Sequence, residues 1–199
     1  MSQADPSPAD PVAPAESEGF PDSLVMPEGS LYSERLPMAM AYAAVKHAPQ
    51  RRKDGPGSPY IGHPVSAAML VWHYGSEDPI FAEEMEDLAI GALLHDVAED
   101  AGGRAALEEI RALFGDRVGQ LVAAATDAMP ALGEEKPEWR PRKEAHIARV
   151  SRLARGDGDA GLAADPGACL VIGADKLHNL SSTAAELTET GPQVLDRFR

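Results

Sequence analysis

The sequence has little cysteine and no long hydrophobic run. Cys169 is the only cysteine in 199 residues, so no intrachain disulfide can form. Its apolar neighbours predict a buried, inert thiol. No apolar run reaches the roughly 18 residues typical of a membrane-spanning helix, and no charged-then-apolar export signal opens the chain. We therefore expect a cytoplasmic protein with no membrane partner.

Other patterns are also absent. The chain shows no period-two alternation typical of strands, no internal repeat and no glycine-rich strand-to-helix phosphate loop. The net charge of −14 argues against a basic surface for nucleic acid. We expect an all-α protein that does not bind nucleic acid. An anionic small ligand would have to be met by a local cluster of bases.

The composition divides the chain into a tail and one domain. Residues 1–30 hold six acids, six of the 17 prolines and no lysine or arginine, which predicts a disordered acidic tail. Residues 31–199 are long enough for one core. Helical periodicity predicts a single bundle of about seven to eight helices, with the main segments at 31–47, 64–73, 85–100, 104–114, 116–127, 139–150 and 166–189.

The segment 85–100 is the centre of the pattern. Its apolar residues are too densely spaced for a helix with one wet face, which indicates a core helix. The next two helices form a pair whose buried stripe includes Leu113.

Polar residues gather at the end of that core helix: His95, Asp96, Glu99 and Asp100. A buried imidazole or carboxylate without a partner costs on the order of 1–3 kcal/mol. Carboxylates are also disfavoured at the negative end of a helix, so the pattern favours a nearby cation. The alternative is a frayed acidic helix end.

Two further residues complete a candidate ligand set. His63 stands at the entrance of the second helix, and Asp175 lies in the last one. Two imidazoles and two carboxylates suit Mn²⁺, Fe²⁺ or a similar divalent ion, whereas a closed structural zinc site would favour cysteine. The alternative is that these side chains are polar groups of the core.

Five blocks resemble the HD metal-dependent phosphohydrolase superfamily. At finer grain they resemble the hydrolase domain of the RelA/SpoT homologue family, especially its stand-alone small alarmone hydrolases. The blocks are 50–54 (QRRKD), 58–64 (SPYIGHP), 92–100 (ALLHDVAED), 114–118 (FGDRV) with 125–127 (ATD), and 174–180 (ADKLHNL).

The resemblance implies a reaction and a role for each matched residue. The reaction is Mn²⁺-dependent removal of the 3′-pyrophosphate of guanosine tetra- or pentaphosphate, giving GDP or GTP and pyrophosphate. The implied Mn²⁺ ligands are His63, His95, Asp96 and Asp175, and Glu99 and Asp100 would orient and deprotonate the attacking water. Arg52 and Lys53 would face the phosphates and Asn179 the nucleoside, with Lys143 of the basic segment 139–150 as a further substrate-binding candidate.

The chain departs from the family pattern in three places. The basic residue that often follows this aspartate in relatives is missing after Asp127, where Ala128 stands, and Ser181 stands where many relatives have arginine. Relatives also continue into a further aromatic helix, so we expect that helix to be either shortened or missing in this chain.

The sequence leaves other functions open. They are hydrolysis of the adenosine counterpart (p)ppApp, removal of the phosphate of NADPH, and a non-catalytic nucleotide-binding antidote or regulatory module. The presence of Glu99 and Asp100 favours an enzyme, because a binding module needs no water-activating pair. Candidate protein partners are a second copy of the chain and a cognate alarmone synthetase.

Overall fold

The computed structural model describes residues 26–53, 57–127, 138–156 and 163–198. Most of the predicted tail, the loop 129–137 and part of the loop 156–165 lie outside these residues. The described residues contain eight α-helices, two short 3-10 helices and one isolated bridge between Arg51 and Pro59. The predicted all-α bundle is therefore confirmed. The α-helices are α1 (Arg35–Lys46), α2 (Gly62–Gly75), α3 (Met85–Leu94), α4 (Val97–Asp100), α5 (Gly103–Phe114), α6 (Asp116–Ala125), α7 (Trp139–Arg155) and α8 (Pro166–Thr190), and the 3-10 helices are η1 (Pro79–Phe81) and η2 (Pro192–Phe198).

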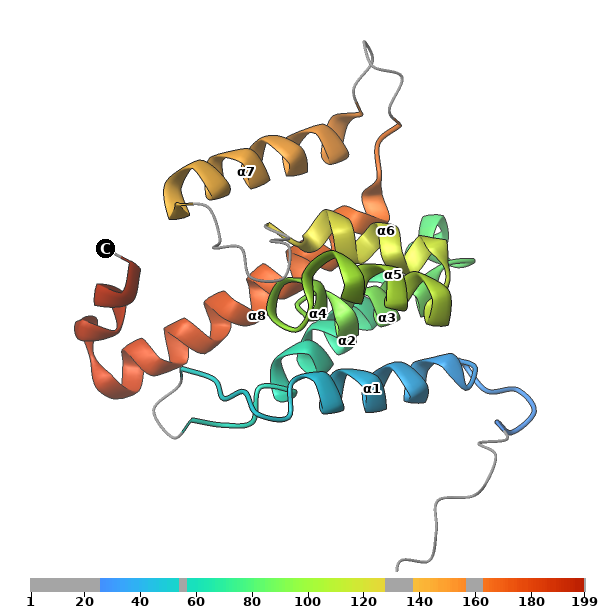
Figure 1. Ribbon diagram of the computed structural model, residues 1–199, viewed down its shortest axis with the longest axis horizontal. Coiled ribbons are helices and arrows are strands. Elements are labelled where there is room, and N and C mark those ends of the chain that lie inside the picture. Colours follow the sequence, from blue (N-terminus) through green and yellow to red (C-terminus); the bar gives the residue numbers. More distant parts are fainter. Residues whose placement is uncertain (1–25, 54–56, 128–137, 157–162, 199) are drawn as a thin grey trace, which may run out of the picture.

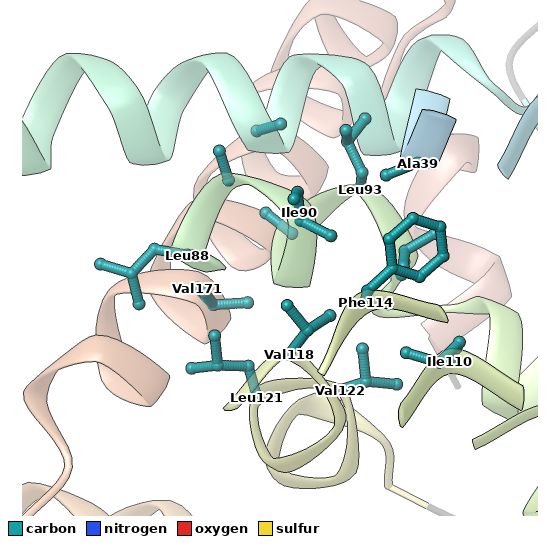
Figure 2. Packing of buried hydrophobic residues seen from close by; sticks show 14 of the residues in the cluster. Ala39, Leu88, Ile90, Leu93, Ile110, Phe114, Val118, Leu121, Val122 and Val171 are labelled. Atoms are coloured by element: carbon teal, nitrogen blue, oxygen red, sulfur yellow. The ribbon is translucent and has the colours of Figure 1, made fainter. Parts of the chain in front are cut away.

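Helix α3 is the centre of the bundle, as the dense apolar pattern predicted. It packs against α1, α2, α6 and α8, and every residue from Leu88 to Leu94 is buried. Figure 2 shows Leu88, Ile90 and Leu93 among the apolar side chains of α5, α6 and α8. Gly91 lets α6 approach closely, because a Cβ at this position would lie 2.9 Å from Cβ of Leu121.

Polar contacts fix where α8 begins. Pro166 suits the first helical turn, and the Asp165 carboxylate accepts a hydrogen bond from the backbone N–H of Ala168 at 2.9 Å. Arg117 of α6 donates to both oxygens of Asp165, at 2.8 and 2.9 Å, and to Glu84 at 2.8 Å. The start of α8 is thus bound to α6 and to the segment before α3.

Helix α7 packs differently from the others. His146 is the only buried residue of α7. The helix packs against α8. Figure 1 shows α7 and α1 on opposite sides of the central helices. Most of what holds α7 in place is therefore polar.

The single helix predicted for 85–100 is wrong. Helical bonding stops after Leu94 and resumes at Val97, and His95 and Asp96 form a turn between α3 and α4. Consecutive residues of a regular helix point about 100° apart, whereas here Nε2 of His95 lies only 3.0 Å from Oδ2 of Asp96. The turn brings two neighbouring side chains to one point.

The placement of Leu113 in the buried stripe is also wrong, because 48% of this residue is exposed. Phe114, which belongs to the same predicted stripe, is buried and packs edge-on against Tyr42, with ring centroids 5.7 Å apart. No described helix is long and apolar enough to cross a membrane.

Candidate functional site

Four predicted side chains meet at one point. The first turn of α2 supplies His63, the turn after α3 supplies His95 and Asp96, and α8 supplies Asp175. Nε2 of His63 lies 3.3 Å from Nε2 of His95, 3.4 Å from Oδ2 of Asp96 and 3.2 Å from Oδ1 of Asp175. Nε2 of His95 lies 3.5 Å from the same oxygen of Asp175.

These separations suit a divalent cation. Two ligands about 2.1 Å from one ion and at right angles to each other lie about 3.0 Å apart. The donor atoms of His63, His95 and Asp96 are close enough to hold a metal ion, and the oxygen of Asp175 approaches both histidines. The residues present therefore fit a site of two nitrogen and two oxygen ligands.

Hydrogen bonds orient both imidazoles toward that point. Nδ1 of His95 lies 2.8 Å from the carbonyl oxygen of Ala92, which can only accept, so Nδ1 carries a hydrogen and the neutral ring presents the lone pair of Nε2. Nδ1 of His63 lies 2.8 Å from Nδ1 of His178. A hydrogen on Nδ1 of His63, accepted by His178, leaves Nε2 of His63 free to bind a cation.

The electrostatics of the cluster also require positive charge. Burial lowers the pKa of His95, but the charge of Asp96 and a hydrogen bond to Asp175 outweigh it and hold this pKa well above its usual range. Burial raises the pKa of Asp175, but hydrogen bonds to His63 and His95 hold it well below its usual range. The two carboxylates thus demand a proton or a cation between them.

Sequence reasoning missed two residues that support the four converging side chains. The Tyr60 hydroxyl donates to Oδ2 of Asp96 at 2.5 Å, and the Tyr60 ring packs between His47 and His63. His178, known only as a neighbour of Asp175 in the sequence, supports His63. The only signal for Tyr60 in the sequence was its position three residues before His63. Because Tyr60 lies in a loop before α2, this spacing did not predict that its side chain contacts His63 and Asp96.

The predicted acidic pair follows His95 and Asp96 in the sequence and lies in α4. Oε1 of Glu99 lies 3.2 Å from Nη1 of Arg142 in α7. Asp100 is exposed and its charge helps to raise the pKa of Tyr60, after the larger effects of burial and Asp96. The two acids therefore face different neighbours, Glu99 toward α7 and Asp100 toward the loop before α2.

The predicted substrate-binding residues fall into two places. Arg52 lies near Asn179, with both terminal guanidinium nitrogens 3.4 Å from Oδ1, and Lys53 is exposed on the same loop. Lys143 lies instead on α7, where it donates to the buried carboxylate of Asp127.

The fold and the cluster define an all-α protein whose helices bring two histidines and two aspartates together as a candidate divalent-metal centre. The chain belongs to the HD domain family, because the family model described as "HD domain" matches residues 39–197.

Named relatives agree with this assignment. The chain is 34% identical over 142 residues to "Guanosine-3′,5′-bis(diphosphate) 3′-pyrophosphohydrolase MESH1" of Homo sapiens, covering 71% of this chain and 65% of that protein. It is 36% identical over 95 residues to "Guanosine-3′,5′-bis(diphosphate) 3′-pyrophosphohydrolase" of Aquifex aeolicus, covering 48% of this chain and 12% of that protein. The alignment thus spans just under two thirds of the human relative.

A solved structure is also similar. It is described as "A metazoan ortholog of SpoT hydrolyzes ppGpp and plays a role in starvation responses". It matches with a TM-score of 0.60 and 29% identity, over 78% of this chain and 74% of that one.

Proposed function

We propose that this protein hydrolyses the 3′-pyrophosphate of guanosine tetra- or pentaphosphate, releasing pyrophosphate and GDP or GTP. The observation that carries the proposal is the convergence of His63, His95, Asp96 and Asp175 beside an acidic pair, in a chain similar to proteins named as such hydrolases. We assign residues 31–199 to the hydrolase domain.

The four converging residues would hold one Mn²⁺ ion. When bound, a divalent ion of this kind polarises a phosphoryl oxygen and lowers the pKa of a water ligand. Tyr60 and His178 hold two of the ligands in orientation. The role of Tyr60 and His178 is to keep the donor atoms of these ligands in place before the substrate arrives.

Glu99 and Asp100 are the proposed acids that orient and deprotonate the attacking water. Each carboxylate can accept a proton, and Arg142 fixes the direction of Glu99. Arg52, Lys53 and Lys143 would balance the charge of an anionic substrate, and Asn179 would contact the nucleoside. Arg52 and Asn179 are already within reach of each other.

The proposed compartment is the cytoplasm, because the proposed substrate is a free purine nucleotide. A second copy of the chain and a cognate alarmone synthetase are the proposed protein partners.

The test is ion-exchange chromatography of guanosine tetraphosphate incubated with chelator-stripped protein, with and without Mn²⁺. We expect Mn²⁺-dependent release of GDP and pyrophosphate that is lost in His95→Ala and in the double variant Glu99→Gln, Asp100→Asn. His73→Ala is the matched control, because His73 is an exposed histidine of α2. Turnover by the double variant equal to that of the wild type would contradict the assigned role of the acids. If the wild type does not hydrolyse guanosine tetraphosphate but hydrolyses the adenosine counterpart or NADPH, the proposed substrate is wrong.

A further inference from the structure

Basic residues of α7 form a cluster beside the candidate metal centre. Nη1 of Arg142 lies 2.8 Å from Oδ1 of Asp127 and 3.2 Å from Oε1 of Glu99. Lys143 donates to the other oxygen of Asp127, and Arg149 donates to the carbonyl oxygen of Thr126. Among the described residues, the cluster places these three cations beside the two carboxylates of Asp127 and Glu99.

His146 lies within this cluster and is only 6% exposed. Its Nδ1 lies 2.7 Å from Nη2 of Arg149. A guanidinium can only donate, so Nδ1 must accept, and a neutral imidazole then carries its hydrogen on Nε2. Burial and the charges of Arg149 and Lys176 lower the pKa of His146, which keeps the ring neutral at pH 7.

Three buried donors of the cluster have no acceptor among the described residues. They are the Nε2–H group of His146 and the Nε–H groups of Arg142 and Arg149. A buried donor left unpaired destabilises the fold, because the hydrogen bond it made to water in the unfolded chain is not replaced. These three donors lie at i, i+4 and i+7 on one face of α7, and with an excess of positive charge they suit an anion with several acceptor oxygens.

The cluster lies on one side of the ligands and the Arg52–Asn179 contact on the other. On α8, Lys176 points about 100° from Asp175 in one direction, and His178 points about 60° from it in the other. His178 contacts His63, and Arg52 lies 3.4 Å from Asn179, the residue that follows His178. Nζ of Lys176 donates to Oδ2 of Asp175 at 2.6 Å, and its charge also acts on His146, so Lys176 links the ligand Asp175 to the α7 cluster.

We propose that Arg142 and His146 bind the terminal phosphate of the substrate's 3′-diphosphate and make the site selective for a diphosphate over a 3′- or 2′-monophosphate. This inference rests on the proposed function. With the nucleoside at Asn179 and the reacting phosphate at the four ligands, the next phosphate of the chain extends toward α7. A monophosphate ends at the ligands and leaves the donors of Arg142 and His146 unpaired.

The test compares two substrates that differ only in the terminal phosphate. They are guanosine 3′,5′-bis(diphosphate) and guanosine 5′-diphosphate 3′-monophosphate, each assayed with the Mn²⁺-loaded wild type, Arg142→Gln, His146→Leu and His146→Gln. We expect the ratio of kcat/KM for the two substrates to fall by about 10- to 100-fold in Arg142→Gln and His146→Leu, because a hydrogen bond to a charged group contributes roughly 1.5–3 kcal/mol. His146→Gln keeps an N–H donor and should recover part of the ratio.

Arg152→Gln is the matched control, because Arg152 is an exposed arginine of the same helix, and its ratio should not change. Calorimetric titration with inorganic pyrophosphate and with orthophosphate gives a second readout that needs no turnover. We expect pyrophosphate to bind the Mn²⁺-loaded wild type more tightly than orthophosphate, and His146→Leu to lose this preference.

The outcomes separate the two proposals. No hydrolysis of either nucleotide by the wild type overturns the proposed function, and the pyrophosphate titration then still decides the role of α7. An equal fall in kcat/KM for both nucleotides, or an unchanged pyrophosphate preference in a folded His146→Leu protein, overturns the terminal-phosphate site.

Discussion

At the scale of single residues, the candidate centre depends on side chains that are not ligands. Tyr60 donates to Asp96 at 2.5 Å and packs edge-on against His63, with ring centroids 5.6 Å apart. It therefore fixes both a carboxylate and an imidazole. Residues of this kind commonly change metal affinity by about 10- to 100-fold.

Tyr60→Phe should weaken Mn²⁺ binding by about 10-fold or more, because Asp96 loses a fixed hydrogen bond while the aromatic contacts remain. The measurement is a Mn²⁺ titration followed by calorimetry. Tyr74→Phe is the control, because Tyr74 is an exposed tyrosine of α2. An unchanged Mn²⁺ affinity in Tyr60→Phe would show that the Tyr60 hydroxyl does not support the metal site.

At the scale of elements, α7 is held by charge and α3 by close packing. The Asp127 carboxylate is only 5% exposed and accepts from both Arg142 and Lys143. Burial raises the pKa of Asp127, but the hydrogen bond to Lys143 and the nearby charges lower it to about 2. Asp127 is thus the main anchor of α7 on the end of α6.

Asp127→Asn should lower the free energy of unfolding by more than about 1 kcal/mol at pH 7, because two cations lose their buried partner. The pKa of Asp127 is lower in the folded state than in the unfolded state. Its contribution is therefore complete above about pH 4 and is lost as the pH falls toward 2.

Urea denaturation of both proteins from pH 7 to pH 2.5 measures this difference. The difference in free energy of unfolding between the wild type and Asp127→Asn should become smaller at the acidic end of this range. A gap that stays constant across this range would show that the charge of Asp127 does not stabilise the fold.

Gly91→Ala should destabilise the crossing of α3 and α6 by about 1–3 kcal/mol. The new Cβ would lie 2.9 Å from Cβ of Leu121, and neither backbone can shift without disturbing the core. Thermal unfolding measures the effect. Gly173→Ala is the matched control, since a Cβ there meets nothing within 4 Å, and this variant should be as stable as the wild type or more stable.

At the scale of the whole molecule, the candidate centre ties α2, the end of α3 and α8 together. A metal bound only by the folded state adds RT ln(1 + [L]/Kd) to stability, or about 2.7 kcal/mol at 100 times Kd. For a domain of this size that corresponds to a rise in Tm of roughly 5–10 °C.

Saturating Mn²⁺ should therefore raise the Tm of chelator-stripped protein by roughly 5–10 °C, as followed by circular dichroism. His95→Ala should abolish the rise and His73→Ala should keep it. The same Tm with Mn²⁺ and with chelator would favour the alternative in which these histidines and aspartates are only polar groups of the core.

Periodicity by itself determined the all-α class and the position of α3, because an apolar pattern on every face admits only a buried helix. The residue types His63, His95, Asp96 and Asp175 also limited the chemistry, because buried imidazoles and carboxylates need a cation or a proton. The pattern did not give the break between α3 and α4. Local periodicity continues through His95, and the interruption belongs to a turn that brings two adjacent side chains together.

Only the tertiary structure decided which polar side chains support the centre and how α7 lies. Contacts between residues far apart in the sequence, such as Tyr60 with Asp96 and His178 with His63, depend on how helices pack. The position of Arg142 between Asp127 and Glu99 depends on the same packing. Sequence patterns fix which face of a helix is apolar, but the partner that each polar group finds is set by three-dimensional proximity.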